Sequence, residues 1–175
     1  DPASAYGLLR AAIRDPDPVI FFEHKALYAT RSEGPGPPPI LPIGKAAIAR
    51  TGRDLTIVTY GAMLHVVLDA ATALARDGVE TEVIDLRSVQ PWDETAVLAS
   101  LARTHRLVVA HEAVEAFGVG AEIVARMADV GFDELDAPIV RVGAPFMPSP
   151  LAPNLEKDYL PDAARVLAAA RRVLA

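Results

Sequence analysis

The chain has 175 residues, of which 51% are hydrophobic and 23% are charged, a composition typical of a globular domain with a hydrophobic core. Its net charge of −6 and its scattered basic residues argue against nucleic-acid binding, and the absence of cysteine excludes disulfides and thiolate metal sites. No apolar run approaches the ~20 residues that a membrane span requires and no secretory signal opens the chain, so we expect a cytoplasmic protein without a membrane partner.

Residues 1–33 predict a helix, a sharp turn and a short strand. Tyr6, Leu9 and Ile13 recur at helical spacing within residues 3–14, and Asp-Pro-Asp-Pro at 15–18 must end that helix, because each proline lacks an N–H donor. The apolar run at 19–22 predicts a short buried strand. One helix and one strand are too little to bury a core. We therefore expect residues 1–33 to be the end of another α/β domain, in a chain that is processed, engineered or incomplete.

Residues 34–41 are predicted to be a linker. The segment 33–39 reads Glu-Gly-Pro-Gly-Pro-Pro-Pro, which has little capacity to form a helix or to pair in a β-ladder. We place a domain boundary here and a second domain over residues 42–175.

The second domain is predicted to alternate strands with helices. The predicted strands are 44–50, 55–60, 82–86, 107–110 and 139–142, and the predicted helices are 63–76, one opening at 91, 118–127 and 162–174, the last preceded by a Pro-rich loop. Strands that alternate with helices of this length predict an α/β fold in which a mostly parallel sheet is covered on both faces, a three-layer α/β/α arrangement.

Several polar residues follow the predicted strands, where parallel α/β sheets bind their ligands. His111 and Glu112 are one candidate for a base and its orienting partner, but adjacent residues leaving a strand point in opposite directions, so a structural histidine is the favoured interpretation. Asp85 and Arg87 are expected to form an ion pair that braces their loop. The single Gly61 after the first strand of this series argues against dinucleotide binding.

The acidic turn at residues 12–18 is a candidate cation site. The last carbonyls of the preceding helix lack intrahelical partners, and two carboxylates stand close by in the sequence. Hard cations prefer carbonyl and carboxylate oxygens. An ordinary acidic turn solvated by water is the alternative, and the composition of the turn does not decide between them.

Segments along nearly the whole chain together resemble the C-terminal half of the β subunit of thiamine-diphosphate-dependent 2-oxoacid and acetoin dehydrogenases. The segments that carry this resemblance include Val19–Tyr28, Thr59–His65, Val83–Asp93, Leu107–Ala113, Phe117–Ile123, Leu135–Val142 and Pro148–Glu156. The resemblance implies a transketolase C-terminal domain, preceded by the last helix and strand of a pyrimidine-binding domain. Residues 91–93 are similar to branched-chain relatives, and residues 23–25 and 150–153 to pyruvate or acetoin relatives, so the substrate stays open.

The resemblance implies an assembly rather than a free-standing enzyme. Members of the family are α2β2 complexes that hold thiamine diphosphate, with magnesium, between α and β subunits, and that pass an acyl group to lipoyl arms of an acyltransferase core. The implied partners are an α subunit, a second β subunit and this core. The family's cofactor-activating glutamate and substrate-binding histidine precede the part of the subunit that this chain matches. We therefore expect no catalytic or cofactor-binding residue here and an inactive chain on its own. The alternative is a stand-alone interaction module.

Two sites are implied by the same resemblance. The family's potassium site maps onto the backbone oxygens of Ala12 and Ile13 together with Asp15 and Asp17. The acyltransferase core docks through a small domain with basic residues, and Glu156, Asp158 and Asp162 around the Pro-rich loop are the expected acidic counterparts, with a merely solvated loop as the alternative.

Overall fold

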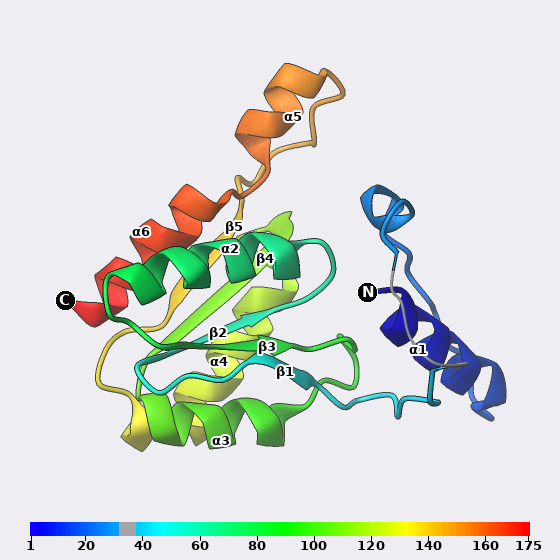
Figure 1. The fold of residues 1–175 in the computed structure, drawn as a ribbon, viewed down its shortest axis with the longest axis horizontal. Coiled ribbons are helices and arrows are strands. Elements are labelled where there is room, and N and C mark those ends of the chain that lie inside the picture. The colour runs from blue at the N-terminus through cyan, green and yellow to red at the C-terminus, as the bar shows by residue number, and fades with distance from the viewer. Residues whose placement is uncertain (32–37) are drawn as a thin grey trace.

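The computed structural model describes residues 1–31 and 38–175, so half of the predicted linker, 34–37, lies outside the described residues. An N-terminal helix, α1 (Pro2–Arg14), and a short 3₁₀ helix, η1 (Lys25–Leu27), lie to one side of an α/β body that carries the strands of the described ranges (Figure 1). Within the described ranges, no helix has the length and apolar character needed to cross a bilayer.

Five strands form one sheet in the order β1-β3-β2-β4-β5. They are β1 (Ala47–Arg50), β2 (Leu55–Thr59), β3 (Thr81–Asp85), β4 (Leu107–Val114) and β5 (Val140–Ala144). The edge strand β1 runs antiparallel to β3, whereas the other three pairs are parallel. The predicted mostly parallel sheet is therefore confirmed.

Helices cover both faces of the sheet. The helices α2 (Met63–Arg76) and α6 (Ala163–Leu174) lie on one face, and α3 (Glu94–Thr104) and α4 (Val119–Val130) lie on the other (Figure 1). Leu55 and Ile57 of β2 belong to the core under α2 and α6, whereas Val58 belongs to the core under α3 and α4, because successive strand side chains point to opposite faces. This is the predicted three-layer α/β/α architecture.

Helix boundaries agree closely with the sequence except before α6 and at the start of α3, which begins at Glu94 after the Asp93 cap and not at 91. The helix α2 has the predicted bounds, and α6 begins after Asp162, whose carboxylate accepts a hydrogen bond from the Arg165 backbone N–H at 2.9 Å. The predicted Pro-rich loop contains a further helix, α5 (Pro153–Tyr159). Its proline stands at the start of the helix, where a missing N–H donor breaks no intrahelical bond.

The strand predicted at residues 19–22 is wrong. These residues form neither strand nor helix, and Ile20 and Phe22 are 79% and 89% exposed. A strand needs a neighbouring strand to pair its backbone N–H and C=O groups. In the part of the chain that the structure describes, no strand lies beside these residues.

Candidate functional site

The carboxyl ends of β2 and β4 form the position at which an open α/β sheet binds ligands. The helix α2 leads from β2 to β3 on one side of the sheet, and α4 leads from β4 to β5 on the other, so the order of the strands reverses between β2 and β4. Tyr60 follows β2 here, and His111 and Glu112 lie in β4. The imidazole of His24, from the N-terminal segment, reaches the same place.

His111 is a structural histidine, as predicted. Its side chain is fully buried, and its Nε2 accepts a hydrogen bond from the Gly120 backbone N–H at 3.0 Å. The proton therefore sits on Nδ1, which donates to the carbonyl oxygen of Ala113 at 3.1 Å. The ring also stacks against Tyr60, with 6.1 Å between ring centroids. Because both ring nitrogens serve the fold, His111 holds the start of α4 against β4 and has no free nitrogen for a substrate.

His111 is expected to make the fold sensitive to acid. Burial lowers the pKa of His111 below its ordinary value of 6.5. The unfolded chain therefore binds a proton on this residue at a higher pH than the folded chain does, and stability falls as the pH drops through 6.5 until the folded residue is also protonated. In denaturant titrations, the free energy of unfolding should fall less between about pH 7.5 and about pH 5.5 for His111→Gln than for the unmodified chain. The exposed His65, changed to glutamine, is the control; an equal change in both variants would contradict the prediction.

Glu112 pairs with His24 and not with the adjacent His111. The His24 Nε2 and Glu112 Oε2 atoms lie 2.7 Å apart, with about one third of each side chain exposed. Burial, and secondarily the charge of Glu112, raises the pKa of Tyr60, so its phenol stays protonated at neutral pH. His24 was not predicted as a partner of Glu112, because 88 positions separate the two residues in the sequence. The pair links the N-terminal segment to the α/β body.

Asp85 and Arg87 form the predicted loop brace at the end of β3. Asp85 Oδ1 accepts the Arg87 backbone N–H at 3.2 Å, and Asp85 Oδ2 lies 3.9 Å from Arg87 Nε. Burial raises the pKa of Asp85, and contacts with Arg87 oppose that shift. The two residues therefore fix the turn that leads from β3 towards α3.

The four predicted cation ligands lie where α1 ends, with Ala12 and Ile13 in its last turn and with Asp15 and Asp17 in the exposed segment that follows. The carbonyl oxygen of Ala12 accepts the Asp15 N–H at 3.3 Å, and Asp15 Oδ1 accepts the Asp17 N–H at 3.0 Å. Two of the candidate oxygens thus already accept backbone hydrogen bonds, and Ile13 lies beside them in the sequence. Across residues 1–31 and 38–175, no three or more His, Cys, Asp or Glu side chains gather as a metal site. The cation site stays a prediction.

The three acidic residues predicted to dock a partner have different settings. Glu156 and Asp158 are exposed on α5, which projects from the α/β body (Figure 1). Asp162 instead caps α6, so its carboxylate already serves the fold. Glu156 and Asp158 are therefore better placed than Asp162 to contact a partner, and docking at these residues stays a prediction.

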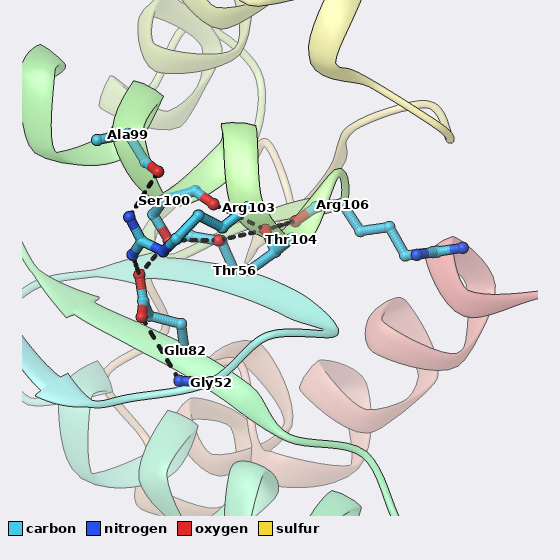
Figure 2. Close-up of polar contacts among 8 residues, drawn as sticks. All are labelled: Gly52, Thr56, Glu82, Ala99, Ser100, Arg103, Thr104 and Arg106. Atoms are coloured by element: carbon cyan, nitrogen blue, oxygen red, sulfur yellow. Dashed lines mark hydrogen bonds and ion pairs between the residues drawn. The ribbon is translucent and has the colours of Figure 1, made fainter.

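A buried polar network lies at the opposite end of the sheet, near the amino ends of β2 and β3 (Figure 2). Glu82 is 3% exposed, and its carboxylate accepts hydrogen bonds from Ser100 Oγ and Arg103 Nη2. Thr56 Oγ1 extends the network, lying 2.6 Å from Ser100 Oγ and 2.7 Å from Thr104 Oγ1. The network fastens α3 to the sheet away from the ligand-binding edge. A charged residue inside the apolar run of β3 is the sequence signal that could have revealed it.

Residues 44–166, which contain the whole sheet, the helices α2, α3 and α4 that flank it, and the start of α6, match the family described as "Transketolase, C-terminal domain". The chain belongs to this family. A solved transketolase C-terminal domain relative, described as "Split gene transketolase, inactive beta4 tetramer", superposes with a TM-score of 0.67 at 29% identity, over 82% of this chain and 45% of that one. The predicted transketolase C-terminal domain fold is therefore confirmed.

Curated relatives extend the similarity beyond the transketolase C-terminal domain to residues 1–43. The acetoin:2,6-dichlorophenolindophenol oxidoreductase subunit beta of Cupriavidus necator is 46% identical over 173 residues, covering 99% of this chain and 51% of the relative. The pyruvate dehydrogenase E1 component subunit beta of Bacillus subtilis is 44% identical over 174 residues, covering 99% and 53%. The resemblance to these β subunits is confirmed, and the chain spans about half the length of the curated relatives it matches.

Proposed function

We propose that the chain is part of the β subunit of a thiamine-diphosphate-dependent dehydrogenase. The complex would oxidatively decarboxylate a 2-oxoacid, or cleave acetoin, and acylate lipoamide. The observation that supports this proposal is the 46% identity with an acetoin oxidoreductase β subunit over 99% of this chain. A pyruvate dehydrogenase β subunit matches almost equally well, so acetoin and pyruvate are the first substrates to test. The stand-alone interaction module has no comparable support.

The chain's contribution to this enzyme would be assembly rather than chemistry. We expect the rest of the assembly to hold thiamine diphosphate and its magnesium, because the family's cofactor-activating glutamate precedes the part of the subunit that this chain matches. Its proposed partners are an α subunit, a second β subunit and an acyltransferase core, in an α2β2 complex of the cytoplasm. Exposed apolar side chains such as Ile13, Ile20 and Phe22 support contact with further protein. Potassium bound at Ala12, Ile13, Asp15 and Asp17 is a further part of the proposal.

The proposal predicts that the intact gene product co-purifies with an α subunit. The gene product, tagged at its C-terminus and isolated from its source, should turn over pyruvate or acetoin with thiamine diphosphate, magnesium and dichlorophenolindophenol as electron acceptor. Residues 1–175 alone should be inactive and should bind no thiamine diphosphate in calorimetry. An intact product of this length without an α subunit would favour the stand-alone module, and micromolar cofactor binding by residues 1–175 would mean that the cofactor site has been misplaced.

Docking of the acyltransferase core at α5 gives a second prediction. Glu156→Gln combined with Asp158→Asn should slow association with the core's subunit-binding domain and flatten its salt dependence, because complementary charges mainly raise association rates. Surface plasmon resonance at two salt concentrations measures both. The conservative Asp133→Asn with Glu134→Gln pair, which lies outside α5, is the charge-matched control. An unchanged association rate and salt slope would identify Glu156 and Asp158 as a solvated surface.

A further inference from the structure

An open groove of about 230 Å³ lies between β5, the outer strand of the sheet, and α6. Three arginines line it, together with one acid and small apolar side chains. The lining residues are Arg141, Arg165 and Arg172, with Glu115, Val140, Val142, Ala168 and Ala169. We call this feature the β5–α6 groove. It lies apart from the position between β2 and β4 at which the order of the strands reverses.

Helix geometry explains why the side chains converge. One face of α6 carries residues 165, 168, 169 and 172, because positions three, four and seven residues after 165 lie on the same side of a helix. Arginines stand at both ends of this face, and alanines between them keep the groove open. Arg141 enters from β5, and Glu115 follows the end of β4.

Backbone carbonyls hold two of the arginines in place without neutralising them. Arg165 Nη2 donates to the Gly143 carbonyl oxygen at 2.6 Å, and its Nη1 donates to the Tyr159 carbonyl oxygen at 3.4 Å. Arg141 Nη1 donates to the Glu115 carbonyl oxygen at 2.7 Å. A carbonyl has no net charge, so each guanidinium is oriented but keeps its positive charge. Side chains fixed in this way lose less conformational entropy when a ligand binds.

The groove contains more positive charge than its single acid can balance. The carboxylate of Glu115 lies 3.9 Å from Arg141 Nη2, and it is the one carboxylate among the lining residues. Three guanidinium groups and one carboxylate leave two positive charges in a chain whose net charge is −6. Elsewhere in the described ranges, six arginines lie within 4.0 Å of a carboxylate: Arg53, Arg87, Arg103, Arg106, Arg126 and Arg171. A ligand that carries about two negative charges would balance the groove.

The contacts favour a compact ligand over an extended peptide. A peptide that added a strand to β5 would need the free backbone groups of this edge. Arg165 already occupies the Gly143 carbonyl, which interrupts such a ladder. Guanidinium groups form paired hydrogen bonds with both phosphate and carboxylate. We propose that the β5–α6 groove binds a compact organic dianion, either a phosphate monoester or a dicarboxylate. This site is independent of the proposed dehydrogenase function.

Titration of the ¹⁵N-labelled 175-residue chain with inorganic phosphate and with succinate, at ionic strength held constant with sodium chloride, tests the site by NMR. At least one anion should produce saturable shifts in the backbone amides of residues 140–144 and 163–174. The anion that binds more tightly identifies the class of ligand. Arg172→Gln should weaken binding at least about fivefold, because it removes one charged hydrogen-bonding partner. Arg172→Lys retains the charge but loses the planar fork, so its affinity for the anion should lie between those of Arg172→Gln and the unmodified chain.

Arg14→Gln is the matched control, since it removes the same charge from an exposed residue of α1 and should leave binding unchanged. Arg172 is itself exposed, so its substitution should not disturb the fold, and the amide spectrum of the variant verifies this. The proposal is overturned if neither anion gives saturable shifts in these segments. It is also overturned if Arg14→Gln weakens binding as much as Arg172→Gln, which would identify general attraction to positive charge.

Discussion

Glu82→Ala is expected to lower the free energy of unfolding by about 3 kcal/mol, the largest loss for any acidic residue of the sheet. The carboxylate is almost completely buried and accepts hydrogen bonds from Ser100 Oγ and Arg103 Nη2, as Figure 2 shows. Ser100 is fully buried and would lose its charged acceptor. Arg103 is about half exposed, so water can solvate it and limit the loss. Urea denaturation followed by circular dichroism measures the change.

Two further variants separate this network from a general loss of negative charge. Glu82→Gln retains an acceptor oxygen but loses the charge. Its free energy of unfolding should therefore lie between those of Glu82→Ala and the unmodified chain. Glu80→Ala removes an exposed acid whose carboxylate lies 3.2 Å from Arg53 Nε, and exposed ion pairs contribute only about 0–1 kcal/mol. Equal losses for Glu82→Ala and Glu80→Ala would show that the buried network does not stabilise the fold.

Gly120→Ala is expected to lower the free energy of unfolding by about 2–3 kcal/mol, because it forces a methyl group into a filled site. An added Cβ would lie 2.7 Å from His111 Cδ2 and closer still to Nε2, and 3.3 Å from Val109 Cγ1. The imidazole is fully buried and held by hydrogen bonds at both nitrogens, so it cannot move aside without losing them. The clash would separate the start of α4 from β4. Thermal and urea unfolding of the variant test this.

A double-mutant cycle identifies His111 as the cause. His111→Ala removes the ring that the new methyl group would meet, so Gly120→Ala should cost much less in that background. The coupling energy between the two sites is expected to be about 1 kcal/mol or more, as for other residues in direct contact. Additive losses would mean that the alanine acts through α4 itself and not through the imidazole.

Local sequence determined most of the secondary structure. The bounds of α2 follow from apolar residues at helical spacing and from Asp77-Gly78 at its end, and both signals act within a few residues. The apolar runs at 55–59 and 107–110 became the central strands β2 and β4 for the same reason. Their alternation with helices predicted the α/β/α layers, since a parallel sheet needs crossover helices. The family resemblance was also a property of local motifs.

Tertiary structure decided the features that depend on a partner distant in the sequence. The apolar run 19–22 has strand character, but it forms no strand because no neighbouring strand lies beside it in the described chain. The antiparallel pairing of β1 with β3 likewise depends on where the chain enters the sheet.

The polar sites show the same division between local and distant information. The types of His24, Glu82 and Arg165 are visible in the sequence, but their partners Glu112, Arg103 and Gly143 lie 88, 21 and 22 positions away. Spacing rules describe neighbours within one helix or strand and cannot pair residues across crossover connections. The sequence by itself therefore determined the elements, the layers and the family. Only the folded chain decided which polar groups are buried together, and which arginines keep their charge free for a ligand.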